Sequence, residues 1–178
     1  MTQHDALIAI YDTHTEADKA VKTLIENGFH MKNFSVIGKG YHTDEKIIGF
    51  YNTGDRMKFW GKYGLFWGGL WGLLFGGVFL TVPVIGPVVV VGQLAAAVIA
   101  AIEGAVLLGG LSALGAGLFS FGIPKDSVVR YEKAIEADSF VVVGHGPVEE
   151  MTRAETLLKA SNPSHFDRHQ AVPFAAAV

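Results

Sequence analysis

Apolar positions at the start of the chain form first a continuous run and then a pattern with a helix-like period. Residues 6–12 (ALIAIYD) form an apolar run with β-branched residues, as in a buried strand. Thr13 and Glu16 then fit a capping box, and apolar residues after them keep a helical spacing. Residues 34–40 (FSVIGKG) predict a second strand, and residues 46–51 (KIIGFY) predict a third. The first part of the chain therefore predicts strand, helix, strand, strand.

The same kinds of pattern return near the end of the chain. Residues 123–138 predict a helix, with a proline in its first turn and apolar residues on one face. Residues 139–146 (SFVVVGHG) predict a strand, and residues 147–160 a last helix that is acidic at its start and basic near its end. Without the segment between the two parts, the order is β-α-β-β-α-β plus a helix. We therefore predict an α+β fold, a ferredoxin-like split βαβ domain.

The segment between the two parts is almost free of charge, since Glu103 is its only ionisable residue from Tyr63 to Ile123. Trp60–Val82 reaches the roughly 20 apolar residues that a membrane-spanning helix needs. Residues 83–87 (PVIGP) predict a turn, and the residues after it predict a return. Both halves of the sheet must meet on one side, and basic residues flank both ends of the segment. These patterns predict a transmembrane helical hairpin with both termini in the cytoplasm.

The predicted organisation has four parts. Residues 1–58 are the first half of the ferredoxin-like domain, and residues 59–122 are the apolar insertion. Residues 123–160 are the second half of the domain. Residues 161–178 form a tail that we expect to dock on a neighbouring subunit. The length of 178 residues suits a single domain with an insertion.

Two stripes of residues run along the first predicted helix of the insertion. Small residues at every fourth position allow two helix backbones to approach closely, and the adjacent rings can fill a neighbour's groove. The stripes therefore predict a helix-packing surface and a homo-oligomer, either in lipid or in a soluble assembly that buries these helices between subunits. The predicted packing residues are Gly64, Gly68, Gly72, Gly76, Trp67, Trp71, Phe75 and Phe79.

Glu103 is the polar residue of the insertion that has two interpretations. A protonated carboxyl could join helices by a hydrogen bond to Gln93 or Ser112, because burial in lipid disfavours its charged form. Carboxylates inside apolar helices also mark ion or proton pathways, which would make the protein an oligomeric channel or carrier. A single carboxylate without a second titratable group forms a poor proton relay, so the sequence favours the hydrogen bond.

Charge and composition narrow the possible chemistry. The net charge of −3 and the lack of a basic stripe argue against a nucleic-acid partner, and the chain has no cysteine for disulfides or thiol catalysis. The sequence contains no recognisable catalytic or nucleotide-binding motif, so we expect no enzyme activity, no cofactor and no small-molecule substrate. His165 and His169 could share a metal ion only if they lay on one helix face. A single pair of histidines is weak evidence for a metal site, so we expect no bound metal.

Four motifs carry a resemblance to a known family: TGDRMKFWGK at 53–62, the glycine-rich stretch after it, VPVIGP at 82–87 and GIPKDSVVRYE at 122–132. Over about residues 5–160 the sequence resembles bacterial membrane proteins related to the general-stress and heat-induced stress protein family. The resemblance implies a ferredoxin-like domain interrupted by an apolar, glycine-rich insertion, and a connection to stress. It implies no reaction, ligand or catalytic residue.

The sequence thus predicts a non-enzymatic, stress-related protein of the cytoplasmic membrane that self-assembles through its glycine-rich helices. Its expected partners are copies of itself and membrane lipid. Two alternatives are an ion or proton channel that uses Glu103 and a soluble scaffold or shell.

Overall fold

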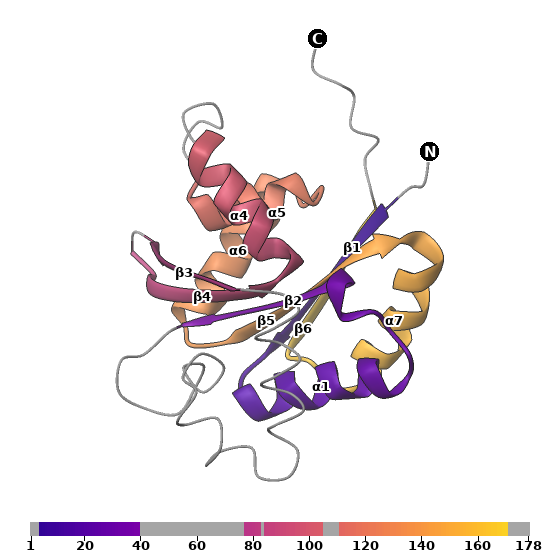
Figure 1. Cartoon of the computed structure of the whole chain (residues 1–178). Coiled ribbons are helices and arrows are strands. Elements are labelled where there is room, and N and C mark those ends of the chain that lie inside the picture. The colour runs from indigo at the N-terminus through magenta and orange to yellow at the C-terminus, as the bar shows by residue number, and fades with distance from the viewer. Residues whose placement is uncertain (1–3, 40–76, 83, 105–110, 171–178) are drawn as a thin grey trace.

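The protein has six strands in one sheet and helices on both faces of that sheet in the described part of the chain (Figure 1). The computed structural model describes residues 4–39, 77–82, 84–104 and 111–170. All paired strands are antiparallel, in the order β3-β4-β2-β5-β1-β6. The elements are β1 (His4–Tyr11), α1 (His14–Glu26), the 3₁₀-helix Met31–Asn33, β2 (Phe34–Lys39), β3 (Gly77–Val82), β4 (Gly86–Gly92), α4 (Gln93–Gly104), α5 (Ala113–Ser120), α6 (Lys125–Glu136), β5 (Phe140–Pro147), α7 (Val148–Ala160) and β6 (His165–His169).

The first strand, helix and strand form as the sequence predicts. The capping box before α1 is present, because the Thr13 hydroxyl accepts from the Glu16 amide and the Glu16 carboxylate accepts from the Thr13 amide. β1 and β2 both pair antiparallel with β5, which lies between them. The two strands joined by α1 are therefore parallel to each other but separated, as in a split βαβ unit.

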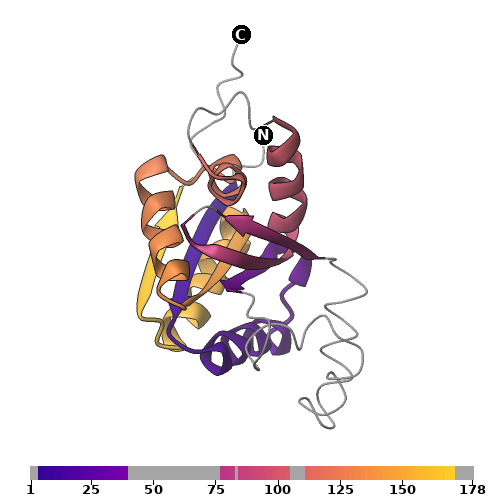
Figure 2. The ribbon, with the colours of Figure 1, turned by 90° about the vertical axis from the view of Figure 1, so that its left-hand side faces the viewer.

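The helices lie on the two faces of the sheet as two layers (Figures 1 and 2). One core cluster joins α1 and α7 to the face that includes Leu7 and Phe34, and the second joins α4, α5 and α6 to the opposite face, which includes Ile8 and Val143. Successive residues of β1 alternate between the clusters, because side chains of a strand point to opposite faces. Both faces of the central strands are therefore covered.

The segment from residue 161 differs from the predicted tail. Residues 165–169 form β6, which pairs with β1 of the same chain at one edge of the sheet. As far as residue 170, the segment docks on the sheet of its own chain. Residues 171–178 lie outside the described residues, as does the predicted strand 46–51.

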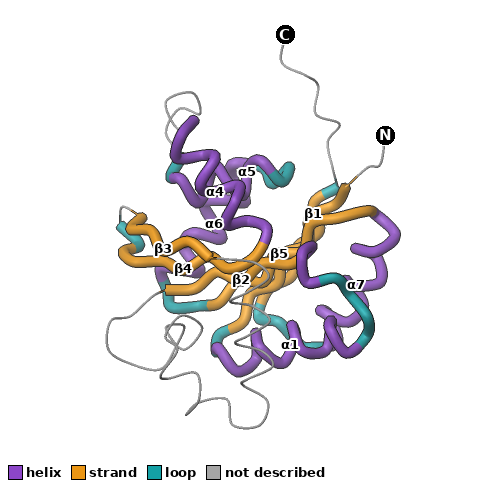
Figure 3. Tube along the Cα trace, in the orientation of Figure 1, coloured by secondary structure: helices purple, strands orange, loops and turns teal. Residues whose placement is uncertain are grey.

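The apolar insertion also differs from the predicted helical hairpin. Gly77–Val82 and Gly86–Gly92 are strands, so the prediction of helix is wrong for residues 77–82 and 88–92 (Figure 3). The four valines at 88–91 explain the difference, because β-branched residues favour strands and here alternate between the two core clusters. Val84 and Ile85 lie in the turn between these two paired strands, where Val84 has φ 73° and Gly86 has φ 95°.

The rest of the insertion forms two short helices. α4 has 12 residues and α5 has 8, and both pack against the face of the sheet that α6 also covers. Within the described residues, none of the helices has both the length and the apolar character needed to span a bilayer. The predicted transmembrane hairpin therefore has no counterpart in this part of the chain. Residues 60–76 of its first helix lie outside the described residues.

Candidate functional site

The surface of α4 and α5, here called the α4–α5 layer (residues 93–104 and 113–120), is the first candidate site. β4 leads directly into α4 at a crossing where Gly92 lies against β2. The amide of Leu94 donates to the buried Ser35 hydroxyl at 2.9 Å, which satisfies one of the free amides at the start of α4. A side chain of β2 therefore positions the first turn of the layer.

Two glycines of α5 allow the layer to pack closely. A Cβ atom on Gly117 would lie 2.7 Å from Val98 Cγ2 and 3.3 Å from the Val98 backbone, so α4 and α5 approach through a glycine. A Cβ on Gly115 would lie 3.0 Å from Val128 of α6. The sequence predicted close packing through small residues in the insertion, but it predicted this for the glycines from Gly64 to Gly76 and not for Gly115 and Gly117. The signal for Gly115 and Gly117 was the small-residue run LGAGL at 114–118.

The outer side of the layer is apolar. Ile99 of α4 is 48% exposed and Phe119 of α5 is 38% exposed, and the alanines at 96 and 100 are exposed beside Ile99. The ammonium group of Lys125 lies 5.8 Å from the Phe119 ring, at the border between the layer and α6. Between residues 93 and 101, α4 carries no ionisable side chain. Ile99 and its two neighbouring alanines are exposed together on α4, and apolar side chains exposed together are typical of surfaces that bind another molecule.

The predicted packing and polar residues of the insertion have different positions in the structure. Phe79 lies in β3, Gln93 is exposed at the first position of α4, and Glu103 lies in the last turn of α4 with a side chain outside the described part. The hydroxyl of Ser112 donates to Glu132 and accepts from the Gly115 amide, which caps α5. The predicted packing residues that lie outside the described residues are Gly64, Gly68, Gly72, Gly76, Trp67, Trp71 and Phe75.

The second candidate is a polar cluster between α6 and β6. His165, Asp167 and His169 alternate along β6 and therefore share one face of the strand. The Tyr131 hydroxyl donates to Asp167 Oδ2 at 2.7 Å and lies 2.6 Å from His169 Nε2. His165 Nε2 lies 2.8 Å from the same carboxylate oxygen, and Arg130 donates to it at 3.2 Å. The two histidines that the sequence suggested as weak metal ligands therefore lie on one face of a strand rather than of a helix, with His165 in contact with Asp167 and His169 in contact with Tyr131.

The cluster is stabilised by its own hydrogen bonds. Burial and the neighbouring Asp167 carboxylate raise the pKa of Tyr131, so this phenol stays protonated as a donor. Burial opposes ionisation of Asp167, but hydrogen bonds from Tyr131 and His165 lower its pKa overall. Burial lowers the pKa of His169. Among the described residues, no three His, Cys, Asp or Glu side chains form a group that could hold a metal ion.

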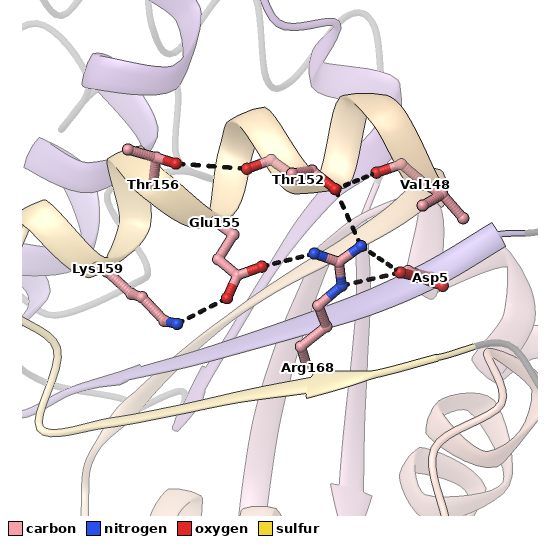
Figure 4. Close-up of polar contacts among 7 residues, drawn as sticks. All are labelled: Asp5, Val148, Thr152, Glu155, Thr156, Lys159 and Arg168. Carbon is pink, nitrogen blue, oxygen red and sulfur yellow. Dashed lines mark hydrogen bonds and ion pairs between the residues drawn. The ribbon is translucent and has the colours of Figure 1, made fainter.

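The opposite face of β6 carries an arginine bound by two carboxylates (Figure 4). The Arg168 guanidinium donates to Asp5 Oδ2 through two nitrogens, at 2.6 and 2.8 Å, and to Glu155 at 2.6 Å. It also donates to the Thr152 hydroxyl at 3.0 Å. The Asp5 side chain is only 2% exposed, in β1, whereas Glu155 and Thr152 lie on α7. Sequence reasoning missed this network, because its members are up to 163 positions apart.

His145 occupies a partly buried position at the end of β5. Its ring stacks on Phe121, with centroids 4.3 Å apart and planes 9° apart, and contacts His4 edge-on at 5.3 Å. Its Nδ1 atom is buried and makes no hydrogen bond within the described part of the chain. Burial, with a smaller effect of His4, lowers the pKa of His145 to about 4.

We expect His145 to make the fold sensitive to acid. Its pKa is about 4 in the folded protein and 6.5 as a free side chain, so the unfolded chain binds more protons between these values. The stabilisation by neutral His145 is therefore complete above pH 6.5 and is lost as the pH falls to about 4. Denaturant unfolding from pH 7.5 to 4 should show a smaller loss in His145→Phe than in the parent. The exposed His30→Phe variant is the control, and an equal loss in all three proteins would contradict this assignment.

Comparison with known proteins concerns mainly the first part of the chain. No curated protein and no solved structure matches the chain. One family model matches residues 6–81, which is less than half of the chain and includes α1, β2 and most of β1 and β3. The α4–α5 layer, the polar cluster and β6 lie outside this segment. Over residues 6–81, the chain is similar to the family described as the heat-induced stress protein YflT domain.

Proposed function

We propose that this chain is a non-enzymatic, stress-related protein that self-assembles through the α4–α5 layer and associates with membrane lipid through the same apolar insertion. The similarity of residues 6–81 to heat-induced stress proteins supports the relation to stress. The observation that carries the proposal is the outer side of α4, where Ile99 is exposed among alanines without a charged neighbour from 93 to 101.

The arrangement of the layer supports association rather than a site for a small ligand. α4 and α5 are already packed through Gly117, and α5 packs on α6 through Gly115. Their inner sides belong to the second core cluster, so only the outer side is available to a partner. A surface that exposes Ile99 and Phe119 gains free energy by burial against another apolar surface, at about 25 cal/mol per Å².

The polar groups around β6 support the non-enzymatic part of the proposal. Tyr131 and Asp167 bind each other and the β6 histidines. The pKa of Tyr131 is raised and that of Asp167 is lowered, so the phenol stays protonated and the carboxylate stays ionised. A general acid or base needs a pKa near the working pH. The Arg168 guanidinium is likewise occupied by Asp5 and Glu155. These groups are arranged to join elements of the fold.

We also propose that the ferredoxin-like unit consists of β1, α1, β2, β5, α7 and β6. In this assignment β6, rather than β5, is its last strand, and α7, rather than α6, is its second helix. The strand order β2-β5-β1-β6 and the position of α1 and α7 on one face support it. The insertion then extends from residue 40 to residue 139 and includes α6.

The alternatives remain as proposals of lower rank. Transport through an oligomer would depend on Glu103, which lies in α4 but whose side chain is outside the described residues. A soluble scaffold would bury the same α4–α5 layer between subunits and would not need lipid. Binding to vesicles separates the leading proposal from the scaffold, and ion flux through vesicles separates it from transport.

The test replaces Ile99 of the full chain with aspartate. We expect the parent protein to sediment as an oligomer and to float with phospholipid vesicles. Ile99→Asp should self-associate about tenfold more weakly, because burial of the exposed half of the side chain contributes on the order of 1 kcal/mol and a buried charge adds a penalty.

A matched control exists on a neighbouring helix. Val129 of α6 is 47% exposed, almost the same as Ile99, but it lies beside charged residues of that helix. Val129→Asp should leave both assembly and vesicle binding unchanged. A parent chain that is monomeric and does not bind vesicles would contradict the proposal, as would equal effects of the two aspartates.

A further inference from the structure

The edge strand β6 differs from β5, the other neighbour of β1, in the kind of contacts that attach it to the fold. Every residue of β6 is partly exposed, whereas β5 on the other side of β1 is buried over most of its length. Phe166 is its only apolar residue in contact with a core cluster. The remaining side chains of β6 are polar, and all of them are bound by groups of β1, α6 or α7. β6 is therefore attached mainly by directional polar contacts.

The groups that receive β6 form a slot with a defined charge pattern. On one side, Asp5 and Glu155 require a cation at position 168 of the strand. On the other side, Arg130 and the Tyr131 hydroxyl require an acceptor at position 167. Adjacent residues of a strand point to opposite faces, so the slot accepts an anion and a cation in that order. The strand sequence HFDRH matches this pattern.

The connection between α7 and β6 is short and has an unusual backbone. Residues 161–164 join the two elements, and Asn162 has φ 60°, which is a left-handed conformation. Pro163 follows it, and proline limits the conformations of the residue before it. The amide of Ser164 donates to the Ile10 carbonyl at 2.8 Å and so begins the pairing with β1. An extended form of this connection would relieve the left-handed conformation of Asn162.

We propose that the slot along β1 also accepts β6 from a second copy of this chain, so that two copies exchange their β6 strands reciprocally. The exchanged pair contains the same contacts to Asp5, Glu155, Arg130 and Tyr131 as the closed monomer. Only the connection 161–164 changes, and for this reason exchange of a terminal element is a low-cost route to a dimer. This interaction uses the β6 edge of the sheet and is independent of the α4–α5 layer.

The experiment uses engineered cysteines, because the natural chain has none. Ala6 of β1 lies directly opposite His169 of β6. Two full-length variants, Ala6→Cys and His169→Cys, are mixed in equal amounts, incubated at several temperatures below the unfolding midpoint, and oxidised with diamide. Exchange places the two thiols side by side and gives a disulfide-linked heterodimer. The expected result is a covalent heterodimer whose yield grows with incubation temperature.

The control mixture pairs Ala6→Cys with Thr156→Cys, an exposed position on α7. It should give no heterodimer above the background of random collision. The double variant Ala6→Cys/His169→Cys, oxidised at low concentration without prior mixing, should close its disulfide within one chain, which verifies the register of β6 in solution.

The proposal is overturned if the double variant closes its disulfide but the heterologous mixture yields no more heterodimer than the control at any temperature. It is also overturned if the double variant fails to close. The mixture is repeated with Ile99→Asp in both chains. If exchange persists in the Ile99→Asp chains, the slot acts independently of the α4–α5 layer. If exchange is lost in these chains, the proposed independence of the two surfaces is contradicted.

Discussion

Replacing Arg168 with glutamine is expected to lower the free energy of unfolding by about 3 kcal/mol, because removal of one partner of a buried ion pair leaves the other poorly compensated. Asp5 is almost fully buried in β1 and receives two of the guanidinium hydrogen bonds. Glutamine can donate from a single amide group, so it cannot serve Asp5, Glu155 and Thr152 together. Chemical denaturation of the full chain at pH 7 measures the change. Hydrogen exchange should also increase first at the amides of β6.

Lys159→Ala is the matched control for this variant. Lys159 forms an ion pair with the same Glu155 carboxylate at 2.6 Å, but its own side chain is 56% exposed. Exposed pairs contribute roughly 0–1 kcal/mol, so this change should lower stability by less than about 1 kcal/mol. Equal losses in the two variants would mean that Arg168 acts as a surface charge, and the slot for β6 would lose its main determinant.

Replacing Gly92 with alanine is expected to have an effect of about 3 kcal/mol or more, the sum of backbone strain and overpacking at a crowded position. Gly92 has φ 105°, which side chains rarely adopt. A Cβ atom there would lie 2.4 Å from the Phe34 carbonyl oxygen and 2.8 Å from the Ser35 Cα. Both are backbone atoms of β2, so they cannot move aside without displacing the strand. The predicted loss is measured by thermal and denaturant unfolding.

Gly86 at the other end of β4 offers a control in the same strand. Its φ is 95°, close to that of Gly92, but a Cβ atom there would meet no atom within 4 Å. Gly86→Ala should therefore show the cost of the backbone conformation alone, about 1 kcal/mol. If both alanine variants lose the same stability, the close approach of β2 to Gly92 does not contribute, and the positioning of α4 by β2 needs another explanation.

The proposed exchange of β6 and the proposed assembly through the α4–α5 layer would respond differently to temperature. Association through Ile99 and Phe119 depends on burial of apolar surface. Exchange of β6 depends on opening the contacts of Arg168 and Asp167, which requires partial loss of tertiary structure and so increases with temperature. The family match over residues 6–81 includes the β1 residues that pair with β6, but neither the α4–α5 layer nor β6 itself. Both surfaces are therefore properties to test on this chain itself.

Local patterns were sufficient to predict much of the fold. The capping box of Thr13 and Glu16 and the helical spacing after it specified α1, and this element depends on contacts within a few residues. The strands β1, β2 and β5 and the helices α6 and α7 were also predicted near their observed positions. The helices have a periodic apolar face, and the strands are short apolar runs that end at recognisable turn residues.

Two parts of the fold were decided only by tertiary structure. Residues 77–92 contain almost no polar residue, so no period distinguished a strand from a helix, and pairing of Val88 to Gly92 with β2 selected the strand. Residues 165–169 are polar on both faces and lack an apolar period of their own. They form β6 because Asp5, Glu155 and Tyr131, which are distant in sequence, supply partners for Arg168 and Asp167. The sequence by itself determined the elements with an apolar face, whereas hydrogen-bond and charge partners from remote segments determined the rest.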